Sequence, residues 1–398
     1  MKRYKLLNNV LGWVVFVIAA VTYILTLEST ASFWDCGEFI ASGYKLEVGH
    51  PPGNPIFMLT ARFFANFASS PSEVAYMVNL MSGLLSAATI LLLFWTITRL
   101  AQKIVLREGE TEETMSLGQM IAILGSGLVG ALAYAWSDTF WFSAVEGEVY
   151  AYSSFCTALV FWLILKWESV ADLPHANRYI ILIAYIIGVS IAVHLLNLLC
   201  IPAIVLVYYY RKYKNTDLKG SLIALLVSFV LIVLLLYGLV PGFVEVAGWV
   251  ELLFVNVFHL PFNSGVVFYF FLIVGVIAWA IYETYAQRSD KLIKISFLIS
   301  IVLVGIPFIG DGYIIGIVLT AVLAYYLFTR KKLAVVAMNT ILLSLFVIFI
   351  GYSSYALIVI RSTANTPMDQ NSPEDIFSLG GYLNREQYGD RPLFYGQT

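Results

Sequence analysis

Two carboxylates three residues apart, Asp35 and Glu38, open the most polar stretch of an otherwise apolar chain. On a helix this spacing places both side chains on one face, with Cβ atoms about 5–6 Å apart. Carboxylates that close repel each other, so one of them can accept or donate a proton near neutral pH, as a general base must. A divalent cation held by Asp35 and Glu38 stays open as an alternative, although proton transfer by a carboxylate requires no metal or other cofactor.

The residues that follow the two acids predict a rigid, turned backbone around His50. In "GHPPGNP", Pro51 and Pro52 fix φ and remove backbone donors, whereas Gly49 and Gly53 allow unusual dihedral angles. Such a loop is built for a purpose rather than merely solvated. The alternative is an ordinary connection whose acids simply face water.

A second polar stretch, "SDTFWFSAVEGEVYAYSS", carries Glu146 and Glu148 next to Tyr150. Two acids beside rings that can stack on a sugar predict contacts with an acceptor or a sugar. The alternative for the aromatic residues is an interfacial belt. His194, near the outer end of an apolar segment, is either part of the same site or hydrogen-bonded to a neighbouring helix, because ionisable groups inside a membrane are costly.

Three cations on the same side of the predicted membrane are candidates for binding a phosphate. Arg361 ends the last apolar run against the charge bias described below, and a guanidinium can hold a phosphate through two hydrogen bonds. The alternative for Arg361 is a snorkelling anchor. Lys45 and Arg62 are the weaker candidates.

The composition shows what kind of element must position these residues. The chain has 398 residues, of which 60% are hydrophobic and only 12% charged, and its mean hydropathy is +0.84. These values indicate an integral membrane protein. A net charge of −2 without a basic patch argues against nucleic acid as a partner. The three cysteines and four histidines are scattered, which argues against a disulfide framework and a zinc cage.

Hydropathy predicts an all-α polytopic protein with about 11 transmembrane helices. Lys and Arg accumulate in cytoplasmic loops, and with the N-terminus inside they divide 18 against 5 over these spans. The N-terminus is therefore predicted to be cytoplasmic and the C-terminus extracytoplasmic. Residues 1–360 form one membrane domain with outer loops at 28–73, 138–152 and 241–265, and 361–398 form an extracytoplasmic tail that could begin a longer soluble region. The predicted spans are 10–27, 74–100, 117–137, 153–167, 179–195, 197–210, 221–241, 266–287, 295–309, 312–329 and 335–360.

The stretch "WDCGEFIASGYKLEVGHPPGNPIF" resembles the opening signature of the domain-of-unknown-function-2723 family, also classed as glycosyltransferase family 117. The chain departs from that signature at Cys36, where Ser is commoner, and in the displaced glycine before His50. The segments "EGEVYAYSSF", "GVSIAVHLLNLLCIP" and "YLNREQYGDRPLFYG" are also similar to segments of that family. The family resembles the GT-C superfamily, which includes the protein O-mannosyltransferases. The matching residues are Asp35, Gly37, Glu38, His50, Pro51, Pro52, Gly53 and Pro55.

The resemblance implies a GT-C-like fold and an inverting glycosyltransferase that uses a polyprenyl-phosphate sugar. It implies a secreted or membrane protein as the acceptor, through a Ser or Thr hydroxyl, and a bacterial inner-membrane location with the active site facing the periplasm. Asp35 would be the general base, and Glu38 would orient the acceptor or tune Asp35. The remaining candidates would bind the donor phosphate (His50, Arg361, Lys45, Arg62) or the acceptor and sugar (Glu146, Glu148, Tyr150, His194).

Two other classes of protein stay open at this point. A polytopic transporter or lipid flippase tends to place ionisable residues near the bilayer midplane and to show repeated halves, whereas here the acids gather in outer loops and no repeat is evident. A noncatalytic membrane scaffold would explain the aromatic residues but not the combination of Asp35, Glu38 and His50.

Overall fold

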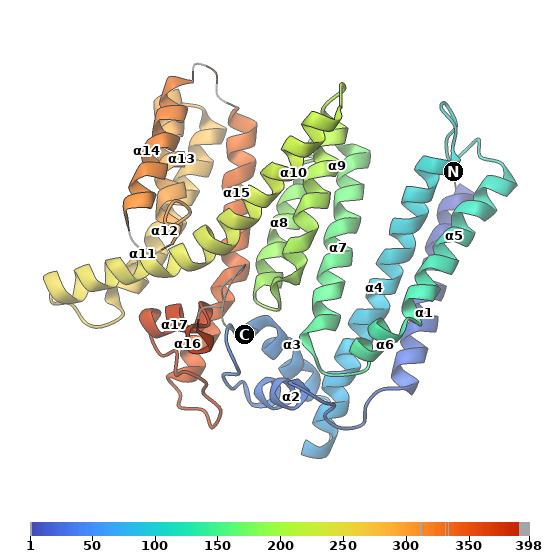
Figure 1. Cartoon of the computed structure of the whole chain (residues 1–398), viewed down its shortest axis with the longest axis horizontal. Helices are drawn as coiled ribbons and strands as arrows, with labels where there is room; N and C mark the ends of the chain where they lie inside the picture. The colour runs from blue at the N-terminus through green and yellow to red at the C-terminus, as the bar shows by residue number, and fades with distance from the viewer. Residues whose placement is uncertain (1, 311–312, 331, 333, 390–398) are drawn as a thin grey trace, which may run out of the picture. The chain divides into compact units, whose positions relative to one another are not determined.

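The computed structural model describes residues 2–310, 313–330, 332 and 334–389, which are folded almost entirely into helices (Figure 1). Within these residues, 8 helical segments are long and apolar enough to cross a membrane, and three shorter apolar helices accompany them. The prediction of an all-α polytopic membrane protein is therefore confirmed. The number of eleven crossings and their direction stay predictions.

Backbone contacts divide the chain into two compact units, and unit 1 holds both predicted catalytic carboxylates. It comprises Met1–Glu47 and Asn54–Lys214. Its long helices are connected by short helical turns. The elements of unit 1 are α1 (Lys2–Leu25), α2 (Cys36–Lys45), α3 (Pro55–Ala65), η1 (Pro71–Glu73), α4 (Val74–Val105), α5 (Leu117–Ala135), α6 (Asp138–Ala144), α7 (Val149–Val170), α8 (Arg178–Ile191), η2 (Leu195–Cys200) and α9 (Ile201–Lys212).

Unit 2 comprises Val48–Gly53 and Asn215–Thr398. It thus includes six residues of the first predicted outer loop as well as the described part of the predicted tail. Its elements are α10 (Leu218–Val233), η3 (Leu234–Leu239), α11 (Val240–Leu252), η4 (Leu253–Val257), α12 (Ser264–Ala286), α13 (Asp290–Leu303), α14 (Tyr313–Thr329), α15 (Val335–Tyr352), η5 (Ser353–Tyr355), α16 (Ala356–Ser362), α17 (Ile376–Leu383) and η6 (Glu386–Tyr388).

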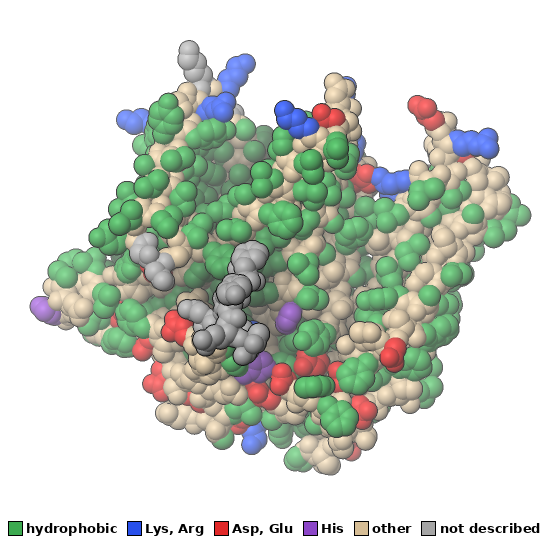
Figure 2. All heavy atoms as spheres, viewed as in Figure 1, with side chains coloured by type: hydrophobic (Ala, Val, Ile, Leu, Met, Phe, Trp, Pro, Cys, Tyr) green, Lys and Arg blue, Asp and Glu red, His purple; other side chains and the backbone are tan. Residues whose placement is uncertain are grey.

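Helix α4 is the centre of unit 1, where it packs against α1, α5 and α7. Pairing some of the polar atoms inside this bundle lowers the cost of burying them. The buried Tyr23 hydroxyl of α1 donates to the Ala135 carbonyl at the end of α5 over 2.9 Å. The buried Trp167 ring of α7 stacks on Tyr208 of α9 with 5.1 Å between ring centroids. Apolar side chains cover the lengths of the helices in each unit (Figure 2).

Several helix boundaries follow from local sequence signals. Helix α5 begins with a capping box, in which Gln119 N–H donates to Ser116 Oγ over 3.2 Å and Ser116 N–H donates to Gln119 Oε1 over 2.8 Å. The break predicted between the apolar segments around residue 196 is confirmed, because α8 ends at Ile191 and α9 begins at Ile201 with Pro202 in its first turn.

The segment 241–265, which was predicted to connect two membrane spans on the outer side, is helical over most of its length, and its outward location stays a prediction. Helical structure runs on from Leu218 to Val257. The predicted span ended at residue 241, but the helix continues through Pro241, although a proline inside an α-helix removes one hydrogen bond and clashes with the preceding turn. Here a π-helical segment, η3, directly precedes it, and the Val240 N–H donates to the carbonyl of Leu235, five residues back. The wider π turn accommodates the proline without ending the helix.

A close approach of two backbones shapes unit 2. Gly242 of α11 lies against Gly305, in the turn after α13, so closely that a Cβ on Gly242 would stand 2.4 Å from the Gly305 carbonyl oxygen. Gly305 itself has φ +90°, a conformation that favours glycine. Nearby, the buried Tyr269 hydroxyl donates to the Leu303 carbonyl at the end of α13. The contact between α11 and this turn therefore requires glycine on both sides.

Candidate active site

The first predicted outer loop folds in unit 1 as two short helices, α2 and α3, rather than as extended chain. Gly43 of α2 and Ala61 of α3 meet so closely that a Cβ on Gly43 would be 2.7 Å from the Ala61 Cβ. Arg62 closes the pair by donating to the Tyr44 carbonyl, and its guanidinium lies 5.3 Å from the Tyr44 ring centroid. Cation–π contact and the free carbonyls at the end of α2 both favour a cation there.

Asp35 and Glu38 lie at the N-terminus of α2. Phe39 N–H donates to the Asp35 carbonyl over 2.9 Å, so the two acids belong to the same helical turn, as their spacing predicts. The Asp35 side chain is exposed and does not cap the helix, whereas Glu38 is half-buried. The positive end of the helix dipole favours carboxylates at this place. An exposed carboxylate held on a rigid turn can take a proton from an incoming group.

The residues before Asp35 present aromatic rings to the surroundings. Trp34 is 90% exposed and Phe33 is 77% exposed. Trp34 also has φ +59°, an uncommon backbone conformation for a bulky residue, which costs of order 1 kcal/mol and persists where the surrounding structure imposes it. Large exposed rings beside an acid are suited to contact with lipid, sugar or an acceptor chain.

A buried side chain of the second predicted outer loop forms hydrogen bonds with the first. Glu146 is only 4% exposed, and its carboxyl accepts hydrogen bonds from the Ser32 hydroxyl and the Cys36 thiol. Burial raises the pKa of Glu146 despite these two donors. Burial, followed by the nearby charge of Glu146, also raises the pKa of the Cys36 thiol, which keeps it protonated and able to donate. Cys36, at the departure from the family signature, is thus a structural link between the two loops.

The raised pKa of Glu146 predicts how stability depends on pH. Because its pKa is raised, Glu146 keeps its proton in the folded protein at pH values where the unfolded chain has already released it, above the ordinary pKa of 4.5, so this carboxyl costs stability as the pH rises. Glu146→Gln cannot ionise. We expect its melting temperature to rise relative to the parent protein as the pH is increased from about 5 to about 8 in detergent.

Glu110, in the loop between α4 and α5, offers a control of opposite sign. A hydrogen bond from the Arg107 backbone N–H, followed by one from the Gln119 amide, lowers the pKa of the half-buried Glu110, so its contribution to stability is present at high pH and lost as the pH falls. Glu110→Gln should lose stability relative to the parent as the pH rises. If the melting-temperature difference between Glu146→Gln and the parent protein stays constant or shrinks as the pH rises, the raised pKa of Glu146 is contradicted.

Glu148 and the aromatic candidates lie around the N-terminus of α7. The Glu148 side chain is buried and caps α7 by accepting from the Val149 N–H over 2.8 Å. Tyr150, in the first turn, is 45% exposed and lies near enough to Asp35 and Glu148 to interact with their charges. Its ring also meets that of His194, with 5.4 Å between centroids. Glu146, Glu148 and Tyr150 of unit 1 therefore lie near the start of α2, which carries Asp35 and Glu38. His194 is connected to this group through its contact with Tyr150.

His194 has a defined hydrogen-bonding state at its Nδ1 atom. Leu196 N–H donates to His194 Nδ1 over 3.1 Å, which caps the short helix η2. An accepting Nδ1 leaves the proton of a neutral imidazole on Nε2, which can then donate. Three residues on, Asn197 is 1% exposed, and within the described residues neither polar atom of its amide has a hydrogen-bond partner.

Asn79 of α4 is a site residue that the sequence analysis missed. It is completely buried, and its Nδ2 donates to the backbone carbonyls of Glu28 over 2.7 Å and Thr30 over 3.1 Å. The Glu28 N–H in turn donates to the Val145 carbonyl over 3.1 Å. Asn79 thus fixes the chain that leads to Asp35. A single amide inside a long apolar helix was the signal that could have revealed it.

Removing this amide should loosen the start of the first loop. Asn79→Ala removes the donor of two hydrogen bonds, those to the carbonyls of Glu28 and Thr30, and we expect a loss of about 1–3 kcal/mol in stability together with faster proteolysis between residues 28 and 34. Thermal unfolding and limited proteolysis in detergent would measure this. The control is Asn66→Ala, because Asn66 is an exposed residue at the end of α3. Equal effects of the two substitutions would contradict the positioning role.

His50 and Arg361 belong to unit 2. The backbone around His50 is fixed there, because the Val48 N–H donates to the Met368 carbonyl over 3.0 Å and the Tyr382 hydroxyl donates to the Gly49 carbonyl over 2.6 Å. The Pro51–Pro52 peptide bond is cis. Gly53 has φ +76°, and a Cβ there would meet the Tyr382 hydroxyl at 2.7 Å. The predicted rigid turn is confirmed.

The remaining cationic candidates differ in exposure. Arg361 lies half-buried in the last turn of α16, and Lys45 lies exposed in the last turn of α2. Arg62 is occupied by Tyr44, as described above. In the part of the chain that the structure describes, no group of three or more His, Cys, Asp or Glu side chains is arranged to hold a metal ion.

Comparisons with known proteins place these residues in a wider context. Residues 35–217 match the family described as the protein O-mannosyl-transferase TMEM260 N-terminal domain. The chain is 27% identical over 209 residues to protein O-mannosyl-transferase TMEM260 of Mus musculus, a match that covers 52% of this chain and 27% of the relative. It is 23% identical over 189 residues to protein O-mannosyl-transferase tmem260 of Dictyostelium discoideum, covering 46% and 20% respectively. The matches thus span about a quarter of these relatives' lengths. No solved structure matches.

Proposed function

We propose that this chain, distantly similar to membrane protein O-mannosyl-transferases over residues 35–217, transfers a sugar from a polyprenyl-phosphate donor to a hydroxyl group outside the cytoplasm. The names of the relatives favour mannose as the sugar and a protein Ser or Thr as the acceptor. The observation that carries the proposal is the exposed Asp35 carboxylate, held at the start of α2 above acids and rings contributed by the second outer loop.

In the proposed reaction Asp35 accepts the proton of the acceptor hydroxyl. The hydroxyl oxygen then forms a bond to the anomeric carbon while the bond from that carbon to the lipid-phosphate oxygen breaks, through a transition state with oxocarbenium character. The electron pair leaves with the phosphate. Attack from the face opposite the leaving phosphate inverts the anomeric configuration, and the phosphate is a good leaving group without a metal.

The other residues have supporting roles in this proposal. Glu38, one helical turn from Asp35, orients the acceptor. Tyr150 and the Nε2 proton of His194 contact the sugar or the acceptor. His50 and Arg361 supply donors to the departing phosphate, where negative charge develops, and Lys45 is a weaker candidate. The structure engages Arg62, Glu146 and Glu148 in hydrogen bonds that shape the two loops, which favours a positioning role for these three residues.

The direct test is transfer by the purified protein in lipid nanodiscs. We expect radiolabel from a polyprenyl-phosphate mannose to appear on a Ser- and Thr-containing acceptor peptide, with the anomeric configuration opposite to that of the donor. Absence of product together with movement of labelled lipid across a vesicle membrane would instead support a flippase. Product of unchanged anomeric configuration would contradict direct attack by the acceptor.

A further inference from the structure

A cavity of 450 Å³ lies in unit 1 at the far ends of the helices that carry the candidate active site. The active-site residues follow the end of α1 and precede or begin α4 and α7, whereas this cavity is lined by the first turns of α1 and the last turns of α4 and α7. Its size is that of a small-ligand pocket. The proposed transfer reaction makes no use of it.

Cations dominate the lining of this cavity, which we call the basic cavity. Lys5, Arg99 and Lys166 line it, against one carboxylate, Glu112. The ion pair between Lys5 and Glu112 is loose, with 3.8 Å between nitrogen and oxygen, and the Lys5 side chain is half exposed. A hollow lined by charges of one sign concentrates ions of the other sign. The basic cavity is therefore suited to an anion.

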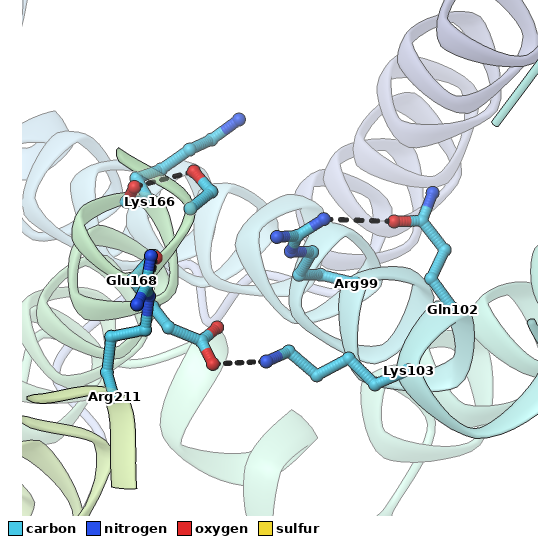
Figure 3. A network of polar contacts seen from close by, with 7 residues as sticks. Arg99, Gln102, Lys103, Lys166, Glu168 and Arg211 are labelled. Atoms are coloured by element: carbon cyan, nitrogen blue, oxygen red, sulfur yellow. Dashed lines mark hydrogen bonds and ion pairs between the residues drawn. The ribbon is translucent and has the colours of Figure 1, made fainter. Parts of the chain in front are cut away.

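Neighbouring side chains hold two of these cations in place without neutralising them. Arg99 donates to the side-chain oxygen of Gln102 over 3.3 Å (Figure 3). Lys166 lies over the Trp162 ring, with its ammonium 4.9 Å from the centroid. In the described residues, no carboxylate forms an ion pair with Arg99 or Lys166.

Glu168, which precedes the lining residue Ser169 in α7, is paired with another residue. Glu168 pairs with Lys103, outside the lining of the basic cavity (Figure 3). Its backbone carbonyl accepts from Arg211 Nε over 3.0 Å. Glu168 therefore forms its ion pair outside the basic cavity.

We propose that the basic cavity binds the phosphate group of an anionic membrane lipid. A row of indole rings leads from the cavity to the outside of the helices: Trp162 and Trp95 have centroids 5.9 Å apart, and Trp95 meets Trp13 at 6.4 Å. Trp13 is 54% exposed, on a helix long and apolar enough to span the membrane. Tryptophan favours the level of lipid headgroups, and basic pockets between transmembrane helices bind anionic headgroups. A free phosphate shares the chemistry but does not use the indole row.

Native mass spectrometry of the full chain in detergent would test the proposal, with phosphatidylglycerol as the probe and phosphatidylcholine as the neutral comparison. We expect the parent protein to retain phosphatidylglycerol preferentially. Arg99→Gln and Lys166→Gln should each weaken this retention by about threefold to tenfold. Glu112→Gln should strengthen it, because it removes the only acid in the described lining, and a gain of affinity cannot arise from misfolding.

The matched control is Lys103→Gln, which removes a cation from the same end of α4 but not from the cavity lining. It should leave lipid retention unchanged. Equal retention of the two lipids by the parent protein, or equal effects of Arg99→Gln, Lys166→Gln and Lys103→Gln, would overturn the proposal. If millimolar inorganic phosphate displaces phosphatidylglycerol, the basic cavity binds phosphate but the ligand is not specifically a lipid, and the lipid proposal is overturned. These readouts do not depend on sugar transfer.

Discussion

Asp35→Asn is expected to lower the rate of sugar transfer by about a hundredfold to ten-thousandfold while the protein stays folded. The amide has nearly the shape of the carboxylate but cannot take a proton from the acceptor hydroxyl. Because the Asp35 side chain is exposed and does not cap α2, its replacement removes no helix cap. The measurement is the initial rate of labelled mannose transfer in nanodiscs, with the melting temperature recorded for the same samples.

Asp138→Asn is the matched control for this substitution. Asp138 is also exposed, lies in the first turn of α6, and belongs to the second predicted outer loop. Removing its charge should cost at most about 1 kcal/mol of stability through the helix dipole and should leave the transfer rate near that of the parent protein. Transfer at the parent rate by Asp35→Asn would remove Asp35 from the role of base, and an equal loss in both variants would point to a general electrostatic effect.

Gly242→Ala should strongly destabilise unit 2. The added methyl group would stand 2.4 Å from the Gly305 carbonyl oxygen, and a backbone atom cannot swing aside as a side chain can. Helix α11 must then move away from the turn after α13. We expect a loss of about 3 kcal/mol, at the upper end of the usual cost of overpacking, measured as a fall in the thermal unfolding temperature.

Gly275→Ala tests whether the loss arises from this contact. Gly275 lies within α12 of the same unit, and a Cβ there would meet nothing within 4 Å. The substitution should be neutral or should stabilise the protein by about 0.5–1 kcal/mol, because alanine loses less conformational entropy than glycine in a helix. A comparable loss in both variants would contradict the contact as the cause.

Much of the fold follows from patterns that lie within a few residues of each other. Long apolar runs predict α1, α4 and α12, and the capping box at Ser116 predicts the start of α5. The sequence misled at Pro241, because the π-helical turn that accommodates this proline depends on packing rather than on a local motif. No local pattern predicted that the first polar loop would fold as the two helices α2 and α3.

The candidate site was predictable in its exposed acids and not in its buried framework. Asp35 and Glu38 reveal themselves by their spacing and by their contrast with apolar surroundings. The hydrogen bonds of Asn79 reach back 51 and 49 residues along the chain, and the Cys36 thiol finds Glu146 in another loop. Such pairings depend on tertiary structure, so one sequence does not contain them as a pattern. Glu146 and Glu148 looked like acceptor contacts for the same reason, because their burial could not be read from their neighbours.

The hydrogen bonds that fix the backbone around His50 have a practical consequence for where this protein can be shortened. Met368 and Tyr382, which hold the Val48 N–H and the Gly49 carbonyl, both lie beyond the last apolar segment. A truncation at residue 361 would keep essentially all of the apolar helical segments in the described chain, so hydropathy alone would not reveal that anything was lost. It would nevertheless remove the partners of both hydrogen bonds that hold the backbone next to His50, about three hundred residues away along the chain. A shortened chain that keeps both hydrogen bonds must therefore extend through Tyr382 in α17.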